Sequence, residues 1–558
     1  MNKKLTAATA LALATGVLLT GCQKQTSSNG VKINTDKFPI TDEQQTLRVW
    51  APMHGNHSAG GITSIAETSS AKAMEKLTNV KIEWECAASN DSATLFNLMM
   101  ASNDLPDIFM NSTDTESKYK GTGAIIPITK YVDTYMPNFK KVMNEIPNYK
   151  SDVYDENGDI WGIYSYYPDP NLTGIWTFPL IREDWLKKLN LETPKTQDDW
   201  YKVLKAFKEN DMNGNGNPND EIPLTMNGLW QIRYLGLWPN RVTDDFFVTE
   251  DNKISYGFIE PGYKKGVEFM RKLYSEKLVD NEFLVQDLKQ MERKILTNVA
   301  GAAIGGSYNY VNEFKTQLEN ELPEYDMQIA GILESNLGDG QQYSFDGDVN
   351  RVFSSYGFFI TSNAKNPELA ARWCDSFFSE EGGRAAQFGI EGETYDMVNG
   401  RPTFRDDLMK DENTGVINNL YRARYTFGGD GSYGYSFPHY EDKPEQIDGI
   451  WYPRDITLVF GGDEVFNKTY DARKILNISG KMPSEPSISL NVDEKEAISQ
   501  VMTDVNKFTQ EITAQAITGS ISMNEFDAAV ERVKAMNIDK VIEIYQKAYD
   551  KLIEKRGK

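Results

Sequence analysis

Apolar and polar positions alternate with two different periods in the first part of the chain. Residues 45–50 and 80–84 alternate as β-strands do, and residues 106–110 form a short apolar run typical of a buried strand. Between them, residues 69–78 and 94–100 carry the wider apolar spacing of helices. Strands that alternate with helices in this way predict an α/β fold in which helices cover a parallel sheet.

Later segments continue the helical pattern, and two of them begin with a recognisable cap. Thr196 with Asp199, and Ser522 with Glu525, have the spacing of capping boxes. The expected helices are 197–209, 262–276, 367–379, 494–518 and one long closing helix at 523–554. Residues 308–314 and 355–360 indicate strands or strand-to-helix turns.

The N-terminus has the pattern of an export signal. Lys3 and Lys4 precede a mostly apolar stretch, residues 5–18, which is shorter than the roughly 20 residues that span a bilayer. The tetrapeptide that ends at Cys22, Leu-Thr-Gly-Cys, resembles the bacterial lipoprotein box, which implies that Cys22 is acylated after cleavage. We therefore expect a signal peptide at 1–21, a lipidated flexible tether at 22–44, and a location on the extracellular face of the cell membrane.

Composition narrows the classes of function. The 558 residues contain 59 Lys and Arg against 81 Asp and Glu, a formal net charge of −22. Such an acidic chain lacks the clustered positive charge that grips nucleic acid. Three His and three Cys argue against a His-built metal site and a disulfide scaffold. Cys86 and Cys374 could form a disulfide, although two buried thiols are the favoured interpretation.

Several segments in a fixed order carry a family resemblance. They are 175–176, 181–189, 193–196, 211–223, 357–361, 366–371, 388–394 and the closing helix at 526–549. In this order, behind a lipoprotein box, they resemble family 1 extracellular solute-binding proteins, and in particular the larger lipoprotein-type members. These proteins are the carbohydrate receptors of ABC importers.

The resemblance implies a two-lobe, periplasmic-binding-protein-like (type II) α/β fold with an interlobe ligand cleft and a helical C-terminus. Lobe one is then expected at 45–163 with 357–405, and lobe two at 164–356 with 406–550. Closure of the lobes would trap a carbohydrate, most plausibly an oligosaccharide, and present it to the permease subunits of the transporter. We expect a monomer. A peptide or another metabolite as the ligand stays open at this point.

The most specific local motif is an oxygen-rich loop at 211–221. Oxygen-bearing side chains at the first, third and fifth positions and Gly216 at the sixth resemble the start of an EF-hand loop. The candidate calcium ligands are Asp211, Asn213, Asn215, Asn217, Asp220 and Glu221. The twelfth position is Ile222, so the acidic residue stands one place early, whereas in the resembling family the acidic pair commonly falls one residue earlier still. A plain Asn/Gly turn is the alternative, and calcium, if bound, would be structural.

Aromatic residues supply the candidate sugar contacts, because sugar C–H faces pack on flat rings and hydroxyls need fixed polar partners. The candidates stand where strands end or where the chain is expected to cross between lobes. They are Trp50, His54, Asn111, Trp176, Trp230, Arg233, Trp238, Tyr308, Tyr310, Tyr356 and Trp451. Packing in a core is the alternative for each of them, and Trp185, Trp200 and Trp373 are predicted to be core residues.

Enzymatic motifs are missing from the sequence. It contains no Gly-x-Ser-x-Gly elbow, no phosphate-binding Gly-x-x-x-x-Gly-Lys-Ser/Thr loop and no His-Glu-x-x-His. Carboxylate pairs are too numerous to exclude a glycoside hydrolase, because only their separation in space identifies one. A binding protein without catalytic residues is therefore the prediction, and a cell-surface glycosidase is the alternative.

Overall fold

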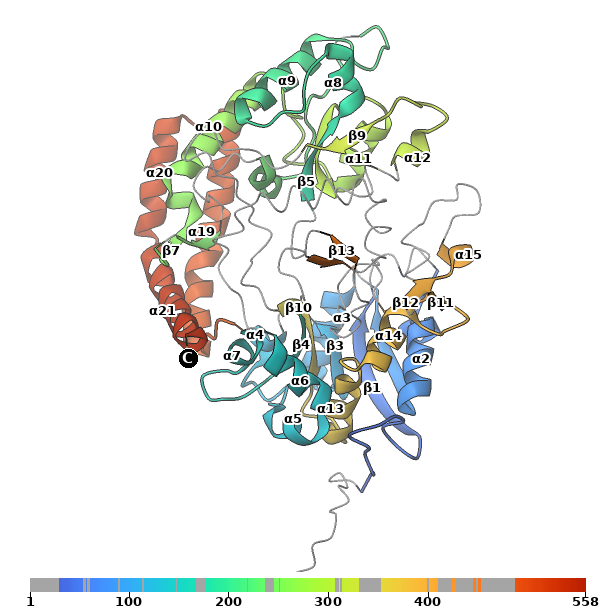
Figure 1. Cartoon of the computed structure of the whole chain (residues 1–558). Helices are drawn as coiled ribbons and strands as arrows, with labels where there is room; N and C mark the ends of the chain where they lie inside the picture. The colour runs from blue at the N-terminus through green and yellow to red at the C-terminus, as the bar shows by residue number, and fades with distance from the viewer. Residues whose placement is uncertain are drawn as a thin grey trace, which may run out of the picture.

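The structure is a computed structural model of the chain. It describes residues 30–53, 57, 61–88, 91–112, 115–146, 148–166, 177–217, 219–235, 245–249, 251–306, 311, 314–330, 353–398, 401–409, 424–427, 445–447, 450–452 and 487–557. Two α/β lobes, each with its own sheet and apolar core, stand one above the other (Figure 1). A layer of C-terminal helices runs along one side of both lobes (Figure 1).

Lobe one is built on a five-stranded sheet in the order β2-β1-β3-β10-β4. Its strands are β1 (Gln45–Pro52), β2 (Val80–Ala87), β3 (Ile108–Ser112), β4 (Ile163–Tyr166) and β10 (Phe353–Ile360). The first three strands pair in parallel, as the sequence pattern predicts, whereas β10 runs antiparallel to both of its neighbours. Because β10 comes from far along the chain, the sheet joins two distant stretches of sequence.

Helices of lobe one pack against this sheet and against one another. They are η1 (Ile65–Glu67), α2 (Ser69–Thr78), α3 (Ser92–Ser102), α4 (Thr115–Tyr119), α5 (Thr129–Tyr135), α6 (Pro137–Glu145), α7 (Tyr149–Val153), α13 (Pro367–Ser376), α14 (Glu380–Phe388) and α15 (Asp406–Met409). Among them, α2 lies on β2 and α13 on β10. A hairpin of β11 (Tyr395–Val398) and β12 (Arg401–Phe404) follows α14. Phe427 is also part of the lobe-one core, so the chain after residue 405, the expected lobe-one limit, still contributes to this lobe.

The segment before β1 lies on lobe one. Ile33 and Ile40 are buried in the core, and a bridge joins Ile33 to Thr41. The guanidinium Nε of Arg372, in α13, donates to the carbonyl of Asn34 at 3.0 Å. The described part of the stretch predicted as a flexible tether is thus packed against the body, because its two isoleucines find apolar partners there.

Lobe two contains the three-stranded sheet β8-β5-β9, and both strand pairs in it are antiparallel. The parallel pairing predicted from residues 45–110 for the first part of the chain therefore does not extend to this sheet. Its strands are β5 (Thr177–Arg182), β8 (Ala302–Gly306) and β9 (Met327–Ile329). Alternate residues of β5 face two different apolar clusters: Ile181 belongs to the large core of lobe two, and Leu180 to a smaller cluster on the other face.

Helices and one hairpin complete lobe two. They are α8 (Glu183–Leu189), α9 (Gln197–Glu209), η3 (Leu229–Leu235), the hairpin β6 (Phe246–Val248) and β7 (Ile254–Tyr256), η4 (Gly257–Ile259), α10 (Pro261–Ser275), α11 (Leu288–Leu296) and α12 (Phe314–Leu318). The predicted capping box at the start of α9 is confirmed, since Thr196 and Asp199 exchange side-chain-to-backbone hydrogen bonds. A separate hairpin joins β13 (Glu445–Ile447) to β14 (Ile450–Tyr452).

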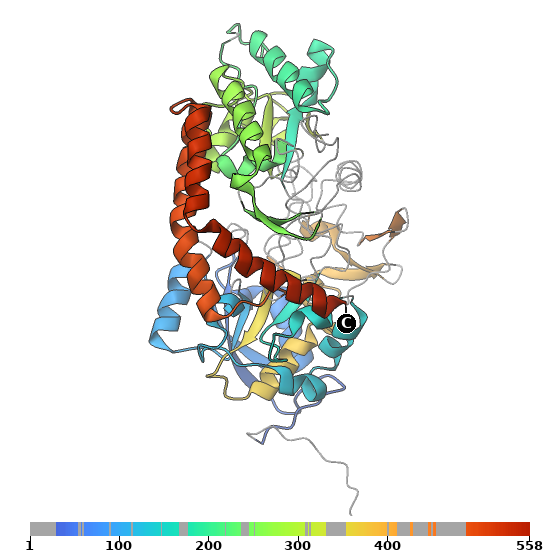
Figure 2. The same ribbon diagram turned by 90° about the vertical axis from the view of Figure 1, so that its left-hand side faces the viewer.

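The C-terminal layer consists of α19 (Val492–Thr518), α20 (Met523–Ala535) and α21 (Ile538–Arg556). Figure 2 shows these helices on the face nearest the viewer, reaching from the upper lobe to the lower one. Their apolar residues belong to the core of lobe two. The single closing helix predicted from the sequence is in fact two, because Asn537 adopts a left-handed conformation (φ 66°) between α20 and α21.

Polar side chains make the contact between the C-terminal layer and lobe one. Arg556 of α21 binds the buried carboxylate of Asp152, in α7, through Nε at 3.0 Å and through a second guanidinium nitrogen at 2.5 Å. Ser487 donates to the same carboxylate at 2.8 Å. Nearby, Ser489 donates to Glu156 at 2.5 Å. The C-terminal helices are thus joined to lobe two by apolar packing and to lobe one by hydrogen bonds and charge.

Two smaller predictions can also be judged. Cys86 and Cys374 are both free thiols, and burial raises the pKa of each. Across the described residues, every helix is too short or too polar to traverse a bilayer. The lobe boundaries given from the sequence remain a prediction, and Cys22 lies outside the described residues.

Candidate functional site

The oxygen-rich loop lies directly after α9, where the helix ends and the chain turns back into lobe two. Asp211 accepts hydrogen bonds from the backbone N–H of Gly214 and of Gly216, each at 2.8 Å. Both glycines have positive φ, at 74° and 84°, which explains why glycine occupies these two positions. The loop is therefore wound around its first carboxylate, as the EF-hand spacing predicts.

The three asparagines of the loop repeat this arrangement. The side-chain oxygens of Asn213, Asn215 and Asn217 each accept from the backbone N–H two residues further on. The amide groups of Asn213 and Asn215 donate to the carboxylate of Asp220, at 3.4 and 2.6 Å. Asp220 therefore closes the loop from the opposite side.

Glu221 is the most unusual residue of the loop because it is almost fully buried, with 2% of its surface exposed. Its Oε1 accepts from the backbone N–H of Met212 at 2.9 Å. Its Oε2 is buried and has no hydrogen-bond partner in the described part of the chain. A buried carboxylate oxygen without a donor is costly, and a bound cation would satisfy it.

The oxygen atoms of this loop are of the kind that a hard cation binds, but its carboxylates do not all gather at one point. Calcium takes six to eight oxygen ligands from carboxylates, amide oxygens, backbone carbonyls and water. Among the described residues no three His, Cys, Asp or Glu side chains gather closely enough to hold a metal. In this geometry an ion in the loop would have to draw most of its ligands from asparagine oxygens, backbone carbonyls and water, with fewer than three of the carboxylates.

A second loop, residues 226–231, follows the metal-type loop after a short extended segment. Ile222 and Thr225 form parallel bridges to Ala300 and Ala303, beside and within β8, so residues 222–225 lie along the edge of this sheet. The last three residues of this second loop, Trp230 among them, form the start of η3, which contacts β5 and β8. Two loops with candidate function are thus joined by four residues of extended chain.

Trp230 is the predicted sugar contact whose side chain the structure describes as exposed. Its surface is 43% exposed, a large value for a tryptophan. The indole N–H donates to the carbonyl of Asn227 at 3.0 Å, which fixes the ring against the loop backbone. Beside it, Oδ1 of Asn227 is buried and accepts no hydrogen bond within the described chain.

The sequence reading did not single out Asn227 or Gly228. Gly228 has a φ of 117°, and a Cβ added there would lie 3.0 Å from Cδ1 of Trp230. The Asn-Gly pair is itself a turn signal, so the turn before Trp230 was predictable from local sequence. The close approach of the ring to the backbone was not.

The other predicted ligand contacts have mixed outcomes. Trp50 is only 7% exposed and packs on Phe96, with ring centroids 4.8 Å apart, so its position is that of a core residue. Trp185, Trp200 and Trp373 are buried, as predicted. Only the backbone is described for Asn111 in β3, Arg233 in η3, Tyr356 in β10 and Trp451 in β14, and His54, Trp176, Trp238, Tyr308 and Tyr310 lie outside the described residues.

A surface groove of about 660 Å³ lies between residues 118–122 of lobe one and the first half of α19. Its lining is polar and charged apart from Val492: Lys118, Lys120, Thr122, Val492, Lys495, Glu496, Ser499, Gln500, Thr503 and Asp504. No aromatic residue is among these described lining residues. This groove is therefore not the ring-lined sugar site that the sequence predicts.

Comparison with known proteins places this architecture. Over residues 62–384, more than half of the chain, the sequence matches the family model of bacterial extracellular solute-binding proteins. The chain therefore belongs to this family, whose members bind solutes outside the cell.

Among curated relatives, the fructooligosaccharide ABC transporter substrate-binding protein FusA of Streptococcus pneumoniae is 32% identical over 321 residues. That match covers 55% of this chain and spans little more than half of FusA, 56% of its length. Lipoprotein LipO of Bacillus subtilis is 27% identical over 412 residues, which are 70% of this chain and 74% of LipO.

Among solved structures, the alginate-binding protein AlgQ2, in a form without calcium ion, superposes with a TM-score of 0.69 at 25% identity. The superposition covers 92% of this chain and 100% of AlgQ2. FusA with kestose has the same TM-score at 24% identity and covers 91% of this chain and 99% of FusA. FusA has also been solved as an EF-hand mutant with fructo-nystose. The likeness confirms the two-lobe fold of the solute-binding proteins.

Proposed function

We propose that this protein is the receptor of an ABC importer, which captures a neutral oligosaccharide outside the cell and delivers it to a membrane permease. The observation that carries the proposal is the 32% identity to the fructooligosaccharide receptor FusA. The matched family and FusA are both binding proteins, so the comparisons give the glycosidase alternative no support.

The charge of the chain favours a neutral sugar over an anionic one. The formal net charge of −22 repels polyanions such as alginate fragments at long range. Trp230 offers an exposed ring on which the C–H face of a sugar can stack. Binding between the lobes would then favour the closed arrangement and give the permease a means to recognise loaded receptor.

A thermal-shift screen tests the ligand class. We expect kestose and fructo-nystose to raise the melting temperature, since a ligand at 100 times its Kd adds about 2.7 kcal/mol to stability. Alginate oligosaccharides should leave it unchanged. Chromatography after long incubation should recover the sugars intact, and their cleavage would favour the glycosidase.

Variants of Trp230 test the site. Trp230→Ala should weaken kestose binding about tenfold or more, because removal of an anchoring tryptophan commonly costs more than about 1.4 kcal/mol. Ile553→Ala is the matched control, since Ile553 is also 43% exposed but lies on α21. Equal affinities for the two variants would remove Trp230 from the site.

We further propose that the loop at 211–221 holds a structural calcium ion, with Asp211, Asn213, Asn215, Asn217, Asp220 and Glu221 as its candidate ligands. The buried, unpartnered Oε2 of Glu221 supports this. The ion would supply charge compensation for the three carboxylates and fix the end of α9. The FusA EF-hand mutant is a parallel in a relative.

Calcium should raise the melting temperature of the wild-type protein, and a chelator should lower it. Glu221→Gln should abolish most of this shift, whereas Glu209→Gln, on the exposed end of α9, should preserve it. A melting curve that calcium does not change would contradict the metal proposal and leave the sugar proposal intact.

Finally, we propose that the mature protein is a monomer, lipid-anchored through Cys22 to the outer face of the membrane. The lipoprotein box and the similarity to lipoprotein LipO support this location. Cys22→Ala should release the protein from the membrane fraction. Retention of the variant in that fraction would argue against lipidation.

A further inference from the structure

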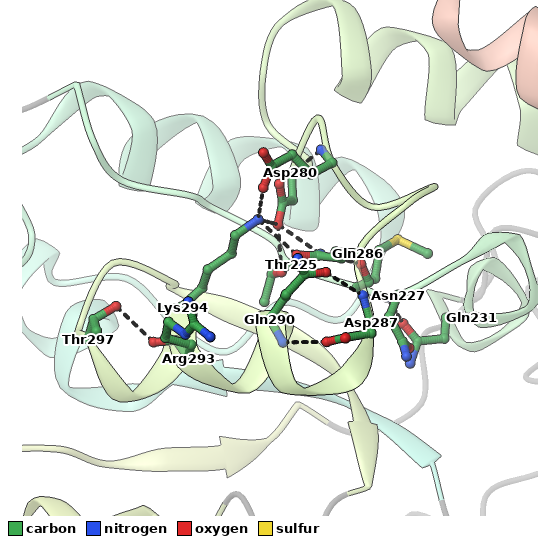
Figure 3. Close-up of polar contacts among 12 residues, drawn as sticks. Thr225, Asn227, Gln231, Asp280, Gln286, Asp287, Gln290, Arg293, Lys294 and Thr297 are labelled. Atoms are coloured by element: carbon green, nitrogen blue, oxygen red, sulfur yellow. Dashed lines mark hydrogen bonds and ion pairs between the residues drawn. The ribbon is translucent and has the colours of Figure 1, made fainter.

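A buried polar cluster lies directly behind the loop that carries Trp230. Figure 3 shows Lys294 of α11 reaching toward Asp280, with Thr225 and Gln286 beside them. Asp280, Thr225 and Gln286 are 6%, 0% and 8% exposed. Asp280 Oδ2 accepts hydrogen bonds from Thr225 at 2.9 Å, from Gln286 at 2.9 Å and from Lys294 at 2.7 Å.

The cluster places one cation, Lys294, between the carboxylates of Asp280 and Glu282, and its polar groups are hydrogen-bonded. Burial lowers the pKa of Lys294, but the carboxylates of Asp280 and Glu282 outweigh it, so the net pKa is raised and the ammonium keeps its proton. Lys294 also donates to Oε1 of Gln286 at 2.8 Å, which fixes the orientation of this amide. Such a network is rigid because each group is held by more than one partner.

The same amide reaches the functional loop. Nε2 of Gln286 donates to the backbone carbonyl of Met226 at 2.6 Å. One residue on, the N–H of Asn227 donates to the buried Gln231 side chain at 2.6 Å. The carbonyl of Asn227 then accepts from the Trp230 indole at 3.0 Å. A continuous chain of short contacts therefore connects Asp280 with the exposed ring.

Gly228 completes this arrangement. The ring of Trp230 lies close to the backbone, so a Cβ at this position would make a tight contact with it, and the φ of 117° also favours glycine. An exposed tryptophan normally samples several rotamers. This ring is restrained by the backbone at Gly228 and by the hydrogen bond from its indole nitrogen to the carbonyl of Asn227. Preorganisation of this kind reduces the entropy lost when a ligand binds.

We propose that Asp280, Lys294 and Gln286 are positioning residues that hold the 226–231 loop, and with it Trp230, in the orientation that receives the sugar. This inference rests on the proposed function for the role of Trp230. The positioning itself is a property of the ligand-free protein and can be tested without a sugar.

Gln286→Leu is the most direct variant, because it removes the bond to Met226 and leaves Asp280 paired with Lys294. Hydrogen–deuterium exchange of the ligand-free protein should show about tenfold faster exchange in residues 226–231. Gln328→Leu is the matched control: Gln328 also donates to a carboxylate of lobe two, that of Asp326 at 2.6 Å, but it lies on β9. Unchanged exchange in 226–231 for Gln286→Leu would overturn the proposal.

Binding of kestose supplies the second measurement. Gln286→Leu should raise the Kd about tenfold in the wild-type background and leave it unchanged in a Trp230→Ala background, because the residue acts through the ring. Equal losses in both backgrounds would overturn the proposal. If no tested sugar binds the wild-type protein, the ligand assignment fails, and the exchange measurement alone decides the positioning role.

Gly228→Ala guards against misfolding of the network variants. It leaves Asp280, Lys294 and Gln286 in place but crowds the ring and strains the turn at residue 228, so it should raise the Kd for kestose as Gln286→Leu does. Exchange in residues 279–294 should stay slow in this variant. An unaltered Kd would contradict the claim that the orientation of Trp230 matters.

Discussion

The two lobes use their buried carboxylates in different ways. In lobe one, Asp152 and Asp375 bind groups far away in the sequence: Asp152 pairs with Arg556, and Asp375 with the N–H of Phe139. In lobe two, Glu221 accepts from Met212 of its own loop, and Asp280 accepts from Thr225 and Lys294. Asp152 and Asp375 of lobe one thus join distant parts of the chain, whereas the partners of Glu221 and Asp280 all lie within residues 212–294.

This difference follows from how each lobe is assembled. The sheet of lobe one takes β10 from a distant part of the chain, and its core includes Ile33 and Phe427 as well. Such a lobe needs specific contacts that fix segments arriving from elsewhere. The described sheet of lobe two comes from one stretch of the chain, residues 177–329, so its charges are available for local shaping.

The largest effect is expected where a long-range pair of lobe one is broken. Arg556→Ala leaves the fully buried carboxylate of Asp152 without its cation, which should lower the free energy of unfolding by about 3–5 kcal/mol. Urea denaturation measures this directly. Lys555→Ala, which loses only a bond to the carbonyl of Tyr154, is the control and should cost far less. Similar losses for the two variants would mean that the pairing of Arg556 with Asp152 does not stabilise the contact between the C-terminal helices and lobe one.

An intermediate effect is expected from the titration of Asp375. Burial raises the pKa of this carboxyl to about 6, even though Arg372 and the amide groups of Asn138 and Phe139 oppose the shift. The folded state therefore binds a proton more tightly than the unfolded state, so this group adds stability as the pH falls from 7 to 5.

Asp375→Asn removes that gain. When the pH is lowered from 7 to 5, the wild-type protein should gain about 1 kcal/mol in free energy of unfolding relative to this variant. Urea denaturation at pH 5, 6 and 7 measures the difference. Parallel curves for the two proteins would show that Asp375 does not titrate in this interval.

The smallest effect is expected from a solvent-exposed pair. Lys264 of α10 and Asp527 of α20 lie 2.7 Å apart, with side chains 33% and 51% exposed. Lys264→Met should change the free energy of unfolding by at most about 0.5 kcal/mol. A loss as large as that of Arg556→Ala would show that burial is not what separates these interactions.

Local signals in the sequence predicted much of the fold. The bounds of α2 follow from Thr68, which caps its start, and from Asn79, which ends it in a left-handed conformation. The capping boxes of α9 and α20 are likewise visible in the sequence. Asn537 carries a similar stop signal between α20 and α21, but the apolar spacing continues on both sides and conceals it.

The candidate site was predictable only in part. The metal-type loop has its candidate ligands in eleven consecutive residues, so spacing alone indicates it. The cluster of Thr225, Asp280, Gln286 and Lys294 is spread over some seventy residues, and no periodic pattern connects its members. Trp50 and Trp230 look alike in the sequence, yet Phe96 and Phe109 cover the first, whereas the second remains exposed.

The contact between Arg556 and Asp152 affects where a probe is best attached to the protein. A fusion partner added after residue 557 would lie beside the ion pair between Arg556 and Asp152. It would therefore strain the contact between the C-terminal helices and lobe one. A label attached before residue 30 instead joins the chain next to the segment whose Asn34 carbonyl binds Arg372, and this segment lies on lobe one. Immobilisation from that side does not load the contact between Arg556 and Asp152, which makes it the better geometry for a binding sensor.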